Sequence, residues 1–99
     1  MYGSHTDARA YFAAHGLSGY PEDQVAGDGL LSRASAVLDD SYRWKGQISD
    51  LSQSRKWPRA GVSDDEGQTI AADEVPARIV MATYELARLL AVHSADLEP

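Results

Sequence analysis

The strongest constraint on the fold is the apolar character of the segment 73–93. Asp73 can cap a helix there, and Pro76 suits the first turn of that helix. Between Ile79 and Val92 almost every helical face is apolar, and charge is confined to a narrow strip. A helix that is apolar on most sides is buried on more than one side. The rest of the chain, or a neighbouring molecule, must therefore cover it.

The length of the chain limits what can cover this helix. Ninety-nine residues suffice for one domain, so residues 1–99 are taken as a single domain. Hydrophobic residues make up 43% of the chain, but 15 of them are alanine, which leaves 28 larger apolar side chains. A monomer of this size buries only about 60–65% of its unfolded surface. Either the 73–93 helix is the central core helix, or a neighbouring subunit covers part of it.

Two further helices are expected before it. The first runs from Thr6, which can cap it, to His15, and Gly16 ends it. The second ends at about Tyr42 and begins either after Pro21 or, because two glycines weaken that stretch, at Asp28. One apolar face of the second helix includes Leu38 and Tyr42. Three charged residues are expected to point away from it: Arg33, Asp39 and Asp40.

The segment 43–73 lacks helical periodicity and is expected to be a long irregular loop. Val62 and Ile70 flank the turn signal Asp65-Glu66-Gly67, which favours a short β-hairpin there. The sequence therefore predicts an all-α fold, a small bundle of three main helices with this loop between the second and the third. The residues expected in the structural core are Tyr11, Phe12, Leu38, Tyr42, Trp44, Trp57, Ile79, Leu86 and Leu90.

Catalytic chemistry has no candidate residues in this chain. There is no cysteine, and the three histidines show no metal-ligand spacing. Neighbouring carboxylates on a helix point in different directions, so the acidic pairs form no acid–base dyad. We therefore predict no enzyme, no catalytic residues, no metal ligands and no cofactor. Neither a signal peptide nor a membrane-spanning segment is recognisable, and the cytoplasm is the expected compartment.

The charge pattern is more informative than the formal net charge of −6, which argues against binding duplex DNA with the whole surface. One stretch carries five basic residues against the single acid Asp50, and it also contains both tryptophans. The basic residues are Arg43, Lys45, Arg55, Lys56 and Arg59. The next stretch carries five acidic residues and no base. They are Asp64, Asp65, Glu66, Asp73 and Glu74.

Three interpretations of this pattern stand side by side. Arg43, Trp44, Lys45 and Trp57 could form a single-strand binding surface, where cations follow phosphates and aromatic rings stack on bases. Both tryptophans could instead be core anchors, which we favour because large apolar residues are few. The basic and acidic stretches could also dock head to tail on a second copy, and such contacts close into a ring when the rotation permits.

Several short segments resemble the small head–tail connector, or adaptor, proteins of tailed bacteriophages. Sequences of this kind are often labelled "putative DnaT-like single-stranded DNA-binding protein". The Trp-Pro-Arg-x-Gly-Val block is the most specific part of the resemblance. The segments that carry it are 8–12, 34–39, 42–46, 53–62, 65–67, 74–76 and 82–87.

The resemblance implies a structural role in the neck of the virion, after assembly in the cytoplasm of the bacterial host. Such adaptors form a ring, usually of twelve copies, beneath the portal protein and extend the DNA channel to the next neck or tail-completion protein. DNA would pass through the lumen without sequence-specific binding, and no membrane is involved. The chain departs from the pattern in its short tail after His93 and in Gln47, where a base is expected. The leading hypothesis is thus a connector subunit, and the alternative is a small single-stranded DNA-binding module.

Overall fold

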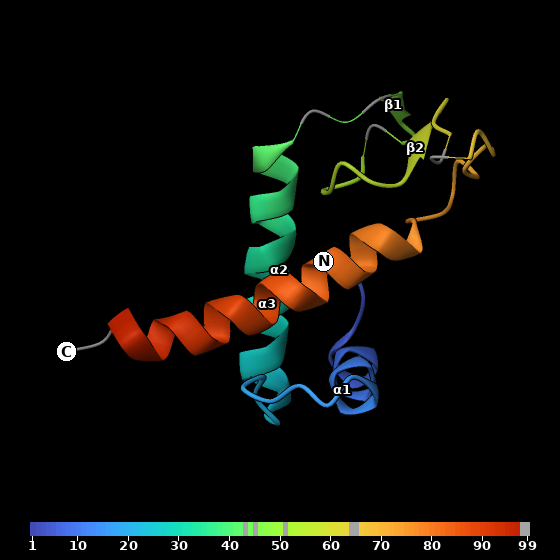
Figure 1. The fold of residues 1–99 in the computed structure, drawn as a ribbon. Coiled ribbons are helices and arrows are strands. Elements are labelled where there is room, and N and C mark those ends of the chain that lie inside the picture. Colours follow the sequence, from blue (N-terminus) through green and yellow to red (C-terminus); the bar gives the residue numbers. More distant parts are fainter. Residues whose placement is uncertain (43, 45, 51, 64–65, 98–99) are drawn as a thin grey trace.

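Three helices and one small sheet make up the structure, a computed structural model that describes residues 1–42, 44, 46–50, 52–63 and 66–97. The predicted architecture of three helices with a long loop and a little β structure between the second and third is confirmed. In Figure 1 the second and third helices cross, and the first lies beside the beginning of the second. The elements in order are α1 (His5–Ala14), α2 (Gln24–Ser41), β1 (Gln47–Ile48), β2 (Arg59–Ala60) and α3 (Ala77–Leu97).

Side-chain caps set the starts of the first two helices. The Ser4 hydroxyl accepts a hydrogen bond of 3.2 Å from the amide of Asp7, so Ser4 and not Thr6 caps α1. The Asp23 carboxylate accepts a bond of 2.9 Å from the amide of Ala26, which starts α2 between its two predicted positions. A capping oxygen placed three residues before an unpaired amide decided both boundaries.

The start of α3 corrects the predicted cap. The amide of Glu74 donates to the carbonyl of Ala71 at 3.1 Å, so Asp73 lies in a turn before the helix. The carbonyl of Pro76 accepts the first bonds of α3, from the amides of Ile79 and Val80 at 3.0 and 3.3 Å. The helix therefore begins at Ala77, and it continues to Leu97, beyond the predicted end at His93.

The β structure forms partly where it was expected. The amide of Ile70 donates to the carbonyl of Val62 at 2.8 Å, and Ser63 and Thr69 form an isolated antiparallel bridge. The predicted pairing of this segment is thus present as a single bridge. The two-stranded sheet lies elsewhere, where Gln47–Ile48 of β1 pairs with Arg59–Ala60 of β2 in antiparallel register.

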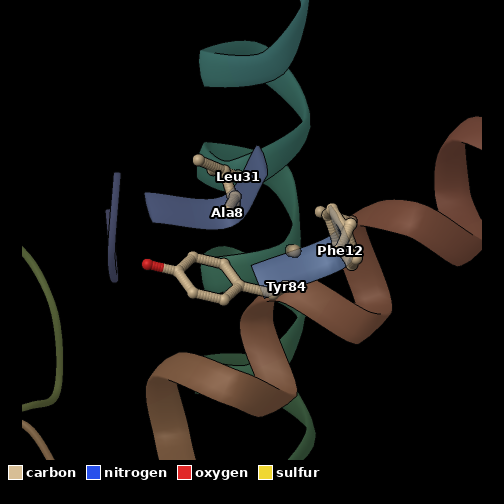
Figure 2. Packing of buried hydrophobic residues seen from close by; sticks show 6 residues of the cluster. Ala8, Phe12, Leu31 and Tyr84 are labelled. Carbon is tan, nitrogen blue, oxygen red and sulfur yellow. The ribbon is translucent and has the colours of Figure 1, made fainter. Parts of the chain in front are cut away.

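The bundle core lies where the three helices meet, as Figure 2 shows. Ala34 of α2 and Ala87 of α3 are fully buried, and such small side chains allow two crossing helices to approach closely. The ring of Tyr84 fills the space beside α1, and its hydroxyl accepts from the amide of Ser4 at 3.3 Å. The buried residues of this core are Ala8, Phe12, Leu31, Ala34, Tyr84 and Ala87.

A second apolar cluster holds the loop between α2 and α3 together and covers the first turns of α3. Its buried residues are Tyr2, Trp57 and Val62, and partly buried apolar side chains, including Trp44 and Ile79, pack against them. We call residues 46–50, 52–63 and 66–76 the loop lobe. The loop lobe, α1 and α2 therefore cover much of α3, but Met81, Leu89 and Val92 remain 41%, 45% and 38% exposed.

The positions predicted for the core divide into three groups. Phe12, Leu38 and Trp57 are buried. Tyr42 is a correction, because its side chain is 56% exposed. The reason is that α2 ends at Ser41, and the extended backbone of Tyr42, with φ −128° and ψ 146°, carries the ring off the apolar face. The half-buried residues are Tyr11, Trp44, Ile79, Leu86 and Leu90.

Candidate nucleic-acid interface

Three aromatic side chains form a row from the surface into the second cluster. The rings of Tyr42 and Trp44 have centroids 5.5 Å apart and planes tilted by 43°. Trp44 meets Trp57 edge to face, with centroids 5.7 Å apart and planes at 74°. Tyr42 is exposed, Trp44 is half-buried and Trp57 is only 5% exposed. The exposed ring of Tyr42 is thus supported from behind by two indoles.

The two tryptophans contribute to this row in different ways. Trp57 belongs to the buried residues of the second cluster, which agrees with its interpretation as a core anchor. Trp44 packs against that cluster but is only partly buried. Both indole Nε1 atoms are buried and have no hydrogen-bond partner within the described part of the chain. A base could therefore stack on Tyr42 and reach Trp44, whereas Trp57 lies behind them.

A buried carboxylate organises the backbone below this row. Asp39 is 5% exposed, against the expectation that it points away from the apolar face. Its Oδ1 accepts from the hydroxyl of Tyr2 at 2.5 Å, and its Oδ2 accepts from the amide of Lys56 at 3.3 Å. The guanidinium of Arg55 lies 3.6 Å from Oδ2. Asp39 follows the fully buried Ser35 by four residues and shares its helical face, but both side chains are polar, so the apolar pattern of the sequence identifies neither of them.

Two cations are held beside the aromatic row by backbone carbonyls. Nζ of Lys56 donates to the carbonyl of Asp39 at 2.7 Å, at the C-terminal end of α2. Nη2 of Arg59 donates to the carbonyls of Gly46 and Trp44, at 2.9 and 3.5 Å. A carbonyl carries no formal charge, so these hydrogen bonds fix where the two cations lie rather than form ion pairs of their own. The carboxylate of Asp39 balances the charge of Arg55.

The other predicted contact residues fall into two groups, those that the structure describes and those that it does not. Glu66, Asp73 and Glu74 are exposed in the part of the loop lobe that precedes α3. Arg43, Lys45, Asp64 and Asp65 lie outside the described residues, so the predicted roles of these four positions stay predictions. Of the four residues predicted to contact nucleic acid, the structure therefore describes the two tryptophans.

The protonation state of Tyr2 follows from its surroundings. Burial raises the pKa of the Tyr2 phenol far above its ordinary value of 10.0, and the hydrogen bond to Asp39 raises it further. The phenol is therefore neutral at physiological pH and remains a hydrogen-bond donor. This keeps Asp39 bonded and the Lys56 segment in place below the aromatic row.

Two further observations concern other kinds of site. In the described part of the chain, no helix combines the length and apolarity needed to cross a bilayer. No cluster of three His, Cys, Asp or Glu side chains suited to a metal ion occurs among residues 1–42, 44, 46–50, 52–63 and 66–97.

The comparison with known proteins identifies a family. No curated protein and no solved structure is significantly similar to the chain. A family model described as "Putative DnaT-like ssDNA binding protein" matches residues 1–98. Because this match spans nearly the whole sequence, the chain belongs to the family described as putative DnaT-like ssDNA-binding proteins.

Proposed function

We propose that this protein binds single-stranded DNA through a surface formed by Tyr42, Trp44, Lys56 and Arg59, which we call the aromatic–basic surface. The single observation that carries the proposal is the exposed ring of Tyr42, packed on Trp44 beside two oriented cations. Single-strand binding needs this combination, because cations follow the phosphates while aromatic rings stack on the bases. The description of the family supports the same function.

The geometry favours a small and salt-sensitive interface. Nζ of Lys56 donates a hydrogen bond to the carbonyl of Asp39, which stands three residues before Tyr42 in the chain. The guanidinium of Arg59 donates one to the carbonyl of Trp44. Both cations are therefore tied to the chain segment that carries the two aromatic rings. The whole chain carries a formal net charge of −6, so the rest of the protein has an excess of acidic residues and would repel phosphates. Binding should thus be confined to this surface and weaken strongly with salt.

A titration of a fluorescently labelled oligothymidylate, followed by anisotropy at low salt, tests the proposal. Replacing the exposed ring in Tyr42→Ala should weaken binding by roughly 5- to 150-fold, since stacking on one aromatic residue contributes about 1–3 kcal/mol. Tyr42→Phe is the matched control, because it keeps the ring and should bind within about twofold of the wild type. Equal affinity of the wild type and Tyr42→Ala would contradict the proposal.

A different observation favours a second function, that of a connector subunit. Met81, Leu89 and Val92 are exposed, and spacings of eight and three residues place them on one side of α3. An exposed apolar line of this kind marks a contact with another molecule. In this second proposal the chain forms a ring under a phage portal, linked to the next neck or tail-completion protein in the virion, and DNA passes through its lumen.

Assembly on a portal protein separates the second function from the first. Mixing the chain with a tailed-phage portal protein should produce ring-sized particles in electron micrographs and sedimentation. Leu89→Glu should abolish these particles, whereas Ser32→Glu, an equally exposed change on α2, should leave them intact. If no particles form with the portal, or if Leu89→Glu assembles like the wild type, the connector proposal is wrong.

A further inference from the structure

A cavity of about 460 Å³, lined by Trp57 but not by Trp44, lies between the loop lobe and the first turn of α3. This volume falls within the range of roughly 300–1,000 Å³ that is usual for small-molecule sites. Trp57 lines the cavity and also touches Trp44 edge to face at 5.7 Å. The cavity is thus linked, through Trp57, to Trp44 of the aromatic–basic surface.

The apolar part of the lining suits a flat ring. It consists of the indole of Trp57 together with Val62, Ile70 and Ile79, which belong to or pack against the second apolar cluster. Trp57 is only 5% exposed, so it presents a small part of its ring to the cavity, which suits an edge-to-face contact with a flat aromatic partner. A flexible aliphatic chain would lose more conformational entropy on entering such a site.

The polar part of the lining suits the edge of a neutral heteroaromatic ring. Ser63 and Thr69, joined by their β-bridge, contribute hydroxyls, and Gln68 contributes an amide. Hydroxyl and amide groups offer both donors and acceptors, as the edges of nucleobases require. Glu74 and Arg78 also line the cavity, and their opposite charges leave it without a net attraction for a bare phosphate.

From this lining we infer that the cavity holds one unpaired nucleobase of a bound single strand. The inference rests on the proposed single-strand binding and deepens it by adding a base pocket next to the stacking surface. Trp57 forms the wall of that pocket, and the neutral polar groups contact the edge of the base. The strand's phosphates remain outside, near Lys56 and Arg59.

Nuclear magnetic resonance tests the pocket with the intact chain. Its two tryptophans give two indole N–H resonances in ¹⁵N spectra, which Trp44→Phe assigns. Each of the four deoxynucleoside monophosphates, added singly, should shift the Trp57 resonance, and ribose 5-phosphate should not. Ala77→Leu places a larger side chain at an exposed position that lines the cavity and should weaken this response by about tenfold or more. Ala72→Leu, exposed and not part of the lining, is the matched control.

The outcomes separate the pocket from the surface. If Ala77→Leu leaves the Trp57 shift and the oligonucleotide affinity unchanged, or if ribose 5-phosphate shifts the resonance as strongly as the nucleotides, the pocket inference is wrong. The proposed function still stands in that case, provided that Tyr42→Ala weakens oligonucleotide binding. If Tyr42→Ala binds like the wild type while the nucleotides still shift Trp57, the surface proposal fails and the cavity is a nucleotide site of its own.

Discussion

The phenol of Tyr2 donates a hydrogen bond of 2.5 Å to Oδ1 of Asp39, across 37 positions of sequence. The same phenolic oxygen accepts a bond of 3.1 Å from the amide of Trp57, and Oδ2 of Asp39 accepts from the amide of Lys56. These two side chains therefore join the N-terminal segment, the end of α2 and the loop lobe. Several long-range contacts of the chain depend on this one pair.

Removing the phenol should loosen the loop lobe. Tyr2→Phe keeps the ring but leaves a buried carboxylate oxygen and the Trp57 amide without their partner. A hydrogen bond to a charged group contributes about 1.5–3 kcal/mol, so the free energy of unfolding should fall by about that amount. Urea denaturation followed by tryptophan fluorescence measures the loss. The control Tyr42→Phe alters an exposed hydroxyl and should change stability by less than about 0.5 kcal/mol; equal losses in both variants would refute the role of the bond.

Alkaline pH should destabilise the protein through its buried tyrosines. The pKa of Tyr2 is raised by burial and by Asp39, and burial raises the pKa of Tyr20 to about 12. Below pH 10 both phenols are protonated in the folded and unfolded states, so their full contribution to the free energy of unfolding is present. As the pH rises past 10, the unfolded chain releases these protons first, and the free energy of unfolding falls until the folded pKa is reached.

Comparison of two variants isolates this effect. Urea denaturation of the wild type between pH 9 and pH 12 should show the decline, and Tyr2→Phe should show a shallower one because it lacks one raised phenol. If the free energy of unfolding declined in parallel with pH for the wild type and for Tyr2→Phe, Tyr2 would titrate alike in the folded and unfolded states.

Alanine substitutions at two glycines of α2, two positions apart, should change the stability of the protein in opposite directions. A Cβ at the buried Gly27 would overlap the ring of His5 and lie 2.7 Å from the hydroxyl of Tyr20. It would break the 3.0 Å bond between His5 Nδ1 and that hydroxyl, at a cost of about 1–3 kcal/mol. A Cβ at Gly29 would have no described atom within 4 Å apart from the nearby backbone of its own helix. Gly29→Ala should therefore stabilise the helix by about 0.5–1 kcal/mol. Thermal unfolding measures both changes, and a stabilised Gly27→Ala would show that His5 is not held as described.

The salt dependence of DNA binding should reveal the role of Lys56. Lys56→Gln keeps a donor for the carbonyl of Asp39 but removes the charge. For single strands, the slope of log affinity against log salt is about −0.7 for each phosphate neutralised, so this variant should lose about 0.7 of its slope. Arg33→Gln removes an exposed cation of α2 and serves as the control with an unchanged slope. An identical loss in both variants would indicate general electrostatic attraction instead of a defined contact.

The sequence by itself determined the elements whose causes are local. Helical periodicity, together with glycines and prolines, located all three helices and the long loop, whereas the capping residues chosen from the sequence misplaced the helix starts by a few residues. For the apolar segment 73–93 the sequence left two alternatives, a central core helix or a helix partly covered by a neighbouring subunit, since a helix with so much apolar surface is stable only when much of it is buried. The burial of Phe12, Leu38 and Trp57 followed from the same patterns.

Only the tertiary structure decided the residues whose surroundings come from distant segments. Asp39 is buried because Tyr2, Arg55 and Lys56 satisfy its carboxylate, and none of them is near it in sequence. Tyr42 is exposed because the chain leaves α2 there to enter the loop lobe. An apolar period of 3.6 residues identifies which face of a helix is buried. It does not identify the segment that will pack on that face. The aromatic–basic surface and the cavity behind Trp57 arise from that long-range packing, which the one-dimensional pattern does not contain.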